Sequence, residues 1–335
     1  MASNNHLRGV IGFILCLALI AFQPCTVFAA DDPIELKLYF ALGKESLQWD
    51  TLTKFMDGVE KTSKGRVQFK RYCCRSLGGG SDAIEGVKGG SIDITAVGTG
   101  LFAKYSPRTN MIMLPYLFRD YDHIYQFVNS PLWGKLTKGL NEHGFKPLTN
   151  LNAGFRDLLT TRKPVRKVAD LQGMKIKVGQ VMPFRIVWEN LGAMAIPMES
   201  NLQYMAMKNG VVEGVELPPT NMRATKLSEV GKYYSPVRIT WLGPLMVMNL
   251  KRWNLLPGDI QKIIQNEVQK ASRYSFEEGA KRNAVDLEYM KSKYGIEEVK
   301  VDLNDFKRHA EKTHEIFQKE DWYDEEIVRK IRDIK

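Results

Sequence analysis

Two basic side chains lie at the ends of strand-like segments, where an open α/β sheet gathers its ligands. Arg156 follows a short apolar segment that ends at Phe155. Lys177 lies in the segment 175–178, whose alternation sends Lys175 and Lys177 to one side of a strand and the apolar residues to the other. Cations placed in this way bind anions through charge-assisted hydrogen bonds. We therefore interpret Arg156 and Lys177 as the anion-binding groups of a cleft. A surface salt bridge is the alternative for Arg156.

The sequence carries no arrangement typical of catalysis or of metal binding. The glycine run 78–81 lacks the Lys-Ser/Thr of a phosphate-binding loop, and no Gly-x-Ser-x-Gly elbow is present. His309 and His314 are five residues apart, and there is no His-Glu-x-x-His. The sequence therefore predicts a protein that is not an enzyme, with no catalytic residues, no metal site and no cofactor.

The adjacent pair Cys73 and Cys74 follows the strand-like segment 67–72. A disulfide between neighbouring residues needs unusual backbone geometry. The pair lacks a histidine or a second cysteine pair at the spacing of a zinc site. Two interpretations stay open, namely thiols with a structural or incidental role and a vicinal disulfide.

Residues 1–30 are expected to form a cleaved secretory signal peptide. Arg8 precedes the apolar run 10–22, and small residues at 27–29 give the usual cleavage spacing near Ala29 or Ala30. An uncleaved anchor is the alternative, although the apolar run is short for a membrane span. The mature protein is thus expected to be soluble and periplasmic.

The remaining residues, about 305, exceed what a single core usually holds, so two lobes are expected. The chain has a net charge of +10, and residues 1–30 contribute +1 of it through Arg8. The mature protein therefore has a net charge of +9. A basic protein can bind nucleic acid, an acidic surface or an anionic substrate. Because the basic residues are interspersed with Asp and Glu and the protein is exported, nucleic acid is excluded and an anionic ligand is favoured.

Strand-like and helix-like segments alternate along the chain. Alternating or continuously apolar runs predict strands over 34–40, 67–72, 92–97, 145–152, 175–178, 192–197 and 211–216. Apolar residues at helical spacing predict helices over 46–62, 81–87, 184–191, 257–294, 304–319 and 325–334. This rhythm indicates an α/β fold whose sheet is mostly parallel, with helices on both faces. No flexible linker divides the chain, so several ordered crossings should join the lobes.

A set of short motifs along the mature chain resembles the solute receptors of tripartite ATP-independent periplasmic (TRAP) transporters, the dicarboxylate-receptor (DctP) family. The motifs lie at 77–79, 90–94, 114–120, 153–218 and 232–235. The resemblance implies a two-lobed periplasmic binding protein fold with a central cleft and a hinge. It places residues 31–153 with 243–281 in the first lobe and residues 154–242 with 282–335 in the second.

The resemblance also implies a set of ligand-binding residues. Arg156 matches a Gly-x-x-Arg-type position, and Lys177 matches a position where the family usually carries an arginine that clamps the ligand carboxylate. Gln180 matches a polar contact, and Leu217 matches a position that is often asparagine. The other candidates come from segments that face the cleft in this architecture: Phe40, Ser81, Thr99 and Trp241.

Lysine at position 177 changes the expected ligand chemistry. Arginine fits a carboxylate with two parallel hydrogen bonds, whereas lysine is a compact point charge that suits a three-oxygen head group equally well. A small sulfonate is therefore a candidate ligand beside a carboxylate. Alternatively, Arg156, or Arg185 on the following helix, could supply the main contact to the ligand carboxylate.

The resemblance further implies the partners. The expected function is capture of a small organic anion and its delivery to a TRAP permease with small and large membrane subunits. The alternative is a periplasmic subunit that senses a small organic acid and presents it to a membrane signalling receptor.

Overall fold

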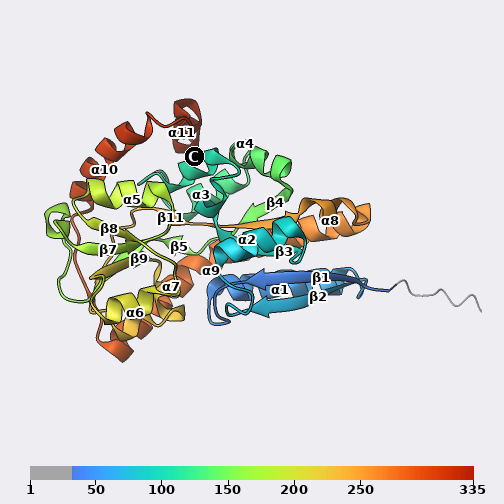
Figure 1. Ribbon diagram of the computed structural model, residues 1–335, viewed down its shortest axis with the longest axis horizontal. Helices are drawn as coiled ribbons and strands as arrows, with labels where there is room; N and C mark the ends of the chain where they lie inside the picture. Colours follow the sequence, from blue (N-terminus) through green and yellow to red (C-terminus); the bar gives the residue numbers. More distant parts are fainter. Residues whose placement is uncertain (1–31) are drawn as a thin grey trace, which may run out of the picture. The chain divides into compact units, whose positions relative to one another are not determined.

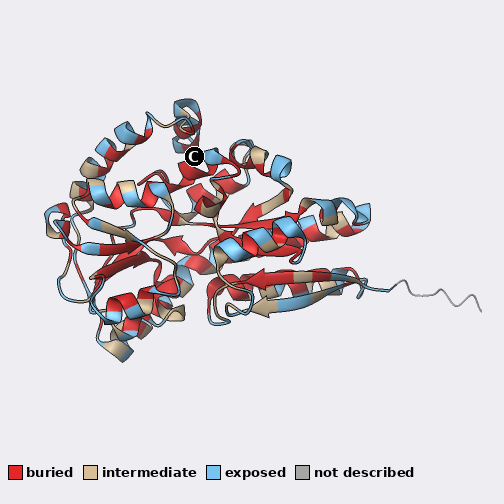
Figure 2. Cartoon of the chain, in the orientation of Figure 1, coloured by how far each residue is buried: buried red, intermediate tan, exposed pale blue. Residues whose placement is uncertain are grey.

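The computed structural model describes residues 32–335, so the expected signal peptide lies outside the described residues. Three sheets are present in this part of the chain, namely one of five strands, one of six and a two-stranded ladder. Helices pack against the two larger sheets (Figure 1). The strands are largely buried, whereas the helices alternate buried and exposed positions (Figure 2).

The first sheet has the strand order β2-β1-β3-β12-β4. The neighbours of β1 are parallel to it, whereas β12 runs antiparallel to both β3 and β4. Its strands are β1 (Ile34–Phe40), β2 (Val67–Cys73), β3 (Ile94–Gly98), β4 (Phe145–Asn150) and β12 (Pro244–Asn249).

Alternating side chains of β1 build two different cores, one on each face of the first sheet. Leu36 and Leu38 pack with apolar residues of α1 (Leu47–Thr62) and of the first half of α9 (Gly258–Tyr294). Tyr39, between Leu38 and Phe40, points to the other face and packs with α2 (Gly80–Gly89). Because successive side chains of a strand point to opposite faces, each face of the sheet presents apolar residues on which helices pack.

The second sheet has the strand order β13-β10-β6-β9-β7-β8. Strands β7, β8 and β9 are parallel to one another, and β6 runs antiparallel to β9 and β10. Its strands are β6 (Asp157–Thr160), β7 (Lys175–Val178), β8 (Met194–Pro197), β9 (Gly214–Leu217), β10 (Tyr233–Ser235) and β13 (Glu297–Glu298).

The second sheet also packs helices on both faces. Leu158 and Ile176 join a core with α5 (Met182–Asn190), α10 (Leu303–Phe317) and α11 (Glu325–Arg332). Leu159 and Val215 join another core with α6 (Gln203–Lys208), α7 (Pro219–Ala224) and Met290 near the end of α9. The remaining α-helices are α3 (Tyr121–Val128), α4 (Pro131–Thr137) and α8 (Leu250–Asn254).

Three segments run between the two large sheets. The strand β5 (Gly154–Phe155) connects β4 to β6, and β11 (Trp241–Leu242) connects β10 to β12. These two short strands pair antiparallel with each other. The third segment is α9, which packs on α1 at the first sheet and on α7 at the second. The ordered crossings expected from the absence of a linker are thus two paired strands and one long helix.

The α/β fold with two lobes is confirmed, but the prediction of a mostly parallel sheet is wrong. Each large sheet is mixed, because β12 and β6 run against their neighbours. Parallel strands need a crossover of a dozen or more residues between them. Both β12 and β6 are instead entered directly from the crossing strands β11 and β5, and the chain therefore arrives from the opposite sheet.

Cys73, the last residue of β2, forms a disulfide with Cys74. The backbone N–H of Cys74 donates to the carbonyl of Leu42, which follows β1. Of the two interpretations left open by the sequence, the structure has the vicinal disulfide.

Within residues 32–335 no helix is both long and apolar enough to span a membrane. The same residues contain no cluster of three or more His, Cys, Asp or Glu side chains that could hold a metal ion.

Substitution of Gly154, in the crossing strand β5, tests how much the crossing strands contribute to stability. Its φ of 129° is a conformation that other residues rarely adopt, and a Cβ there would lie 3.0 Å from the Cβ of Pro218. We expect Gly154→Ala to lower the free energy of unfolding by about 3 kcal/mol through strain and crowding.

The matched control is Gly134→Ala in α4, where a Cβ meets nothing within 4 Å. That variant should be unchanged or up to about 1 kcal/mol more stable. Urea unfolding of both variants makes the comparison, and equal stabilities would contradict the role given to Gly154.

Candidate functional site

A cavity of about 200 Å³ lies where elements of the two large sheets meet. The last residues of β1, β3 and β9 line it, as do residues of β7, β11, α1, α5, α6 and α7. Ligands of open α/β sheets bind at such strand ends. The volume is below the roughly 300–1,000 Å³ of sites for drug-sized molecules, so the cavity fits a small ligand.

Arg156 lies between β5 and β6 and forms a buried ion pair with Glu216 of β9. Its backbone N–H donates to Thr240 at 2.8 Å, which fixes the residue beside the crossing strand β11. The Nη1 group donates to Glu216 Oε2 at 2.7 Å and to Oε1 at 2.9 Å. The guanidinium also stacks 4.3 Å from the ring centre of Phe184. Removal of one partner of such a pair costs about 3–5 kcal/mol, so Glu216 braces the arginine in place.

Lys177 carries a charge into the cavity without a direct partner. Only 4% of the residue is exposed, and its Nζ makes no ion pair or hydrogen bond with any residue that the structure describes. Burial lowers the pKa of Lys177 to about 8. Glu216 opposes this effect by attraction, and Arg156 adds to it by repulsion. Its neighbours Ile176 and Val178 pack in the opposite core, as the alternation predicted.

The buried charges around the cavity do not balance. Arg156 and Lys177 are 7% and 4% exposed, and Glu216 is 1% exposed, so two cations accompany one carboxylate. Glu199 also lines the cavity, but it is partly exposed to solvent. A buried charge is costly unless it is paired. An anion in the cavity would supply the missing partner, and Arg156 Nε and Lys177 Nζ remain free of partners within the described residues.

The predicted neutral residues differ in the chemical groups that they present to the cavity. Gln180 lines the cavity from an exposed position. The hydroxyl of Thr99 is engaged within the protein, because it donates to the carbonyl of Gly243 and accepts from Asn150 Nδ2 at 2.7 Å. Leu217 lines the cavity at the end of β9 and offers only apolar surface.

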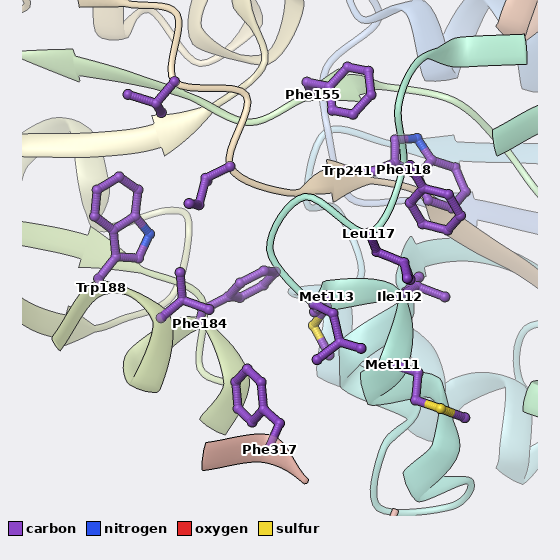
Figure 3. Close-up of a cluster of buried hydrophobic side chains, with 14 of the residues drawn as sticks. Met111, Ile112, Met113, Leu117, Phe118, Phe155, Phe184, Trp188, Trp241 and Phe317 are labelled. Carbon is purple, nitrogen blue, oxygen red and sulfur yellow. The ribbon is translucent and has the colours of Figure 1, made fainter. Parts of the chain in front are cut away.

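Aromatic side chains form much of the apolar wall. Phe40 and Trp241 are buried and line the cavity while packing in the surrounding cores. Figure 3 shows Trp241 beside Phe118, within the same apolar cluster as Phe184 and Met113. The indole N–H of Trp241 donates to Asn152 Oδ1 at 3.0 Å, so this ring presents carbon to the cavity.

The structure brings seven of the predicted site residues to one cavity: Phe40, Thr99, Arg156, Lys177, Gln180, Leu217 and Trp241. It does not bring Ser81 there. Ser81 is exposed on the first turn of α2, and the neighbouring Gly80 lines the cavity instead. Arg185 also lies elsewhere, because its side chain is 61% exposed and pairs with Glu189 on the same helix.

Sequence reasoning missed a group of side-chain amides. Gln48, Gln203 and Asn221 line the cavity and are almost fully buried. A signal was present, since Gln48 shares a helical stripe with the apolar Leu52, and Gln203 shares one with Met207. A polar residue on the buried stripe of a helix marks either a satisfied core group or a ligand contact.

Comparisons with known proteins give a consistent picture. Residues 40–321 match the family model described as bacterial extracellular solute-binding protein, family 7. A 2,3-diketo-L-gulonate-binding periplasmic protein of Escherichia coli is 28% identical over 268 residues, which is 80% of each chain. The C4-dicarboxylate-binding periplasmic protein of Rhodobacter capsulatus is 24% identical over 285 residues, or 85% of each chain.

Among solved structures, one similar chain is a TRAP periplasmic solute-binding protein from Polaromonas, bound to D-erythronate. The TM-score is 0.85 at 25% sequence identity, and the match covers 90% of this chain and 99% of that chain.

Lys177→Met tests the cost of the buried lysine. The ordinary pKa of 10.5 falls to about 8 in the folded protein. At pH 7 the lysine is charged in both states, so its burial costs about 3 kcal/mol of stability. We expect Lys177→Met to raise the unfolding free energy at pH 7 by up to that amount, as measured by urea unfolding without ligand.

The sign of the pH dependence follows from the lowered pKa. The penalty is full below pH 8 and disappears as pH rises towards 10.5, so the gain of the variant should shrink over that interval. Lys175→Met, at the exposed first residue of the same strand, is the control and should change little. A destabilised Lys177→Met protein would contradict this account.

Proposed function

Because the chain belongs to family 7 of the bacterial extracellular solute-binding proteins, we propose that it is the receptor of a TRAP-type transporter for a small organic acid. One observation carries this proposal, namely the two buried cations that share a single buried carboxylate. A carboxylate ligand completes the charge pairing of Arg156 and Lys177. The ligand is proposed to be bound and released unchanged.

The ligand is proposed to be a carboxylate rather than a sulfonate. D-erythronate and 2,3-diketo-L-gulonate, named for two of the similar proteins, are hydroxylated or oxygenated carboxylates. Arg156 supplies a guanidinium Nε that has no partner among the described residues, and Lys177 supplies a point charge beside it. These two groups can serve a planar carboxylate together, although Lys177 lacks the planar fork of the arginine that the resemblance led us to expect at its position.

Binding is proposed to couple to closure of the two lobes. The lobes are proposed to have the predicted bounds, with 31–153 and 243–281 in one and 154–242 and 282–335 in the other. The division at 281/282 falls inside the continuous helix α9, and the other divisions fall at β5 and β11. These few crossing residues are suited to absorb a hinge rotation.

The protein is proposed to act in the periplasm after removal of residues 1–30. It would deliver its ligand to the small and large membrane subunits of a TRAP permease. No observation on residues 32–335 favours the alternative of a sensor subunit.

The experiment that tests this function is a panel of acids against the mature protein. Thermal shift identifies binders, since a ligand that binds only the folded state raises the melting temperature. Isothermal titration calorimetry then gives the Kd. We expect D-erythronate or a six-carbon sugar acid to bind, and a hydroxyalkylsulfonate of matching length to bind at least tenfold more weakly.

Two results would contradict the proposal. A preference for the sulfonate would overturn the carboxylate assignment and restore the alternative raised by the lysine. Binding of none of the acids, with a folded protein by circular dichroism, would overturn the proposed function itself.

Affinity for the acid should depend on pH in a defined direction. Below pH 8 Lys177 is protonated before and after binding, so affinity is full. The bound anion raises the pKa of Lys177, so above pH 8 each binding event must first take up a proton. We expect affinity to fall by up to about tenfold per pH unit between pH 8 and 9.5.

Calorimetry in buffers of different ionisation enthalpy measures this proton uptake directly. Lys177→Met is the control, because its weaker binding should be independent of pH in this range. A flat profile for the unaltered protein would show that Lys177 does not contact the anion.

A further inference from the structure

Three side-chain amides line the cavity in addition to the two cations. Gln48 lies in the first turn of α1, Gln203 begins α6, and Asn221 lies in α7. Their helices pack on different sheets, α1 on the first and α6 and α7 on the second. The amides thus approach the cavity from both lobes.

One hydrogen bond links two of these amides. Gln48 Nε2 donates to Asn221 Oδ1 at 3.1 Å, between side chains that are 1% and 3% exposed. Gln48 Oε1 has no hydrogen-bond partner among the described residues. The pair therefore retains an acceptor, and the two amides are held in place by each other.

Gln203 is the most unusual of the three. It is 1% exposed, and neither Oε1 nor Nε2 has a hydrogen-bond partner among the residues that the structure describes. A buried polar group without a partner costs about 1–3 kcal/mol. Leucine or methionine at this position would pack in the same space without that cost. A donor and an acceptor at the wall of the cavity are the groups that a ligand hydroxyl requires, because a hydroxyl both donates and accepts.

We propose that Gln203, with the Gln48–Asn221 pair, recognises hydroxyl groups on the ligand and selects a hydroxylated monocarboxylate over a dicarboxylate. This inference rests on the proposed function, since it assigns the part of the ligand that Arg156 and Lys177 do not hold.

The charges of the cavity exclude the dicarboxylate. Among the described residues that line it, the only cations are Arg156 and Lys177, and the only other charged side chain is Glu199. A second carboxylate would therefore face neutral amides or the like charge of Glu199. Hydroxyl groups meet no such penalty. A site that hydrogen-bonds a ligand hydroxyl also rejects an analogue that lacks it, because its buried polar groups are then left unpaired.

The test compares four-carbon acids that differ only in their polar groups: D-erythronate, butanoate and succinate. A six-carbon pair, L-gulonate and hexanoate, repeats the comparison at greater length. Calorimetry measures each acid with the unaltered mature protein and with Gln203→Met, which keeps the length of the side chain but removes the amide. Gln265→Met, at an exposed position on α9, is the control.

We expect the unaltered protein to bind at least one hydroxylated acid ten or more times as tightly as the plain acid of equal length, and more tightly than succinate. Gln203→Met should reduce that preference at least tenfold by weakening the hydroxylated acid alone. The control should behave as the unaltered protein does. If Gln203→Met does not fold, the double variant Gln48→Met/Asn221→Leu makes the same comparison.

The outcomes separate the inference from the proposed function. Equal weakening of hydroxylated and plain acids, an unchanged preference, or tighter binding of succinate would overturn the hydroxyl assignment while leaving an acid receptor. Failure of the unaltered protein to bind any of these acids would overturn the proposed function and, with it, the inference.

Discussion

The buried pairing of Arg156 with Glu216 is the interaction on which the cavity depends. Glu216 lies in β9, between β6 and β7 in the second sheet, so one strand braces the arginine before β6 and attracts the lysine on β7. The register places Lys177 opposite Val215, one residue from Glu216. The carboxylate of Glu216 thus forms a direct ion pair with Arg156, whereas it attracts the ammonium of Lys177 only at longer range. The remaining positive charge is what an anionic ligand can use.

The crossing strands place one member of this charge arrangement, Arg156, between the sheets. Arg156 directly follows β5, and Trp241 belongs to β11, so one cavity residue adjoins the ladder that joins the sheets and the other lies in it. The backbone of Arg156 bonds to Thr240 and Ile239, just before β11. Arg156, Lys177 and Glu216 all lie in the second lobe of the proposed division, whereas other residues such as Phe40 and Thr99 line the cavity from the first. In the proposed hinge rotation the first lobe would therefore move against the charged wall of the cavity.

The sequence predicted the charged half of the site better than the neutral half. Strand 175–178 and the roles of Arg156 and Lys177 as cavity cations could be predicted, because a cation at a strand end is unusual and alternation assigns its side. The antiparallel direction of β6 and β12 could not be predicted, since it depends on the sheet from which the chain enters each strand. Ser81 was misplaced because a one-residue shift at a helix start turns a side chain away. The amides were missed because each looks like an ordinary helix residue until its partners are known.

The lowered pKa of Lys177 explains why such a cavity favours binding over an empty closed state. Burial in the cavity desolvates the ammonium and lowers its pKa to about 8. In the open state of the proposed closure, water around the ammonium would restore its ordinary pKa and remove that cost. Closure without an anion therefore carries the full desolvation of the unpaired charge, whereas closure around an anion replaces water with a charge-assisted bond. The difference between these two free energies is the quantity by which a ligand shifts the equilibrium between open and closed states. In the proposed closure, the unpaired charge of Lys177 would thus favour the closed state only when an anion is bound.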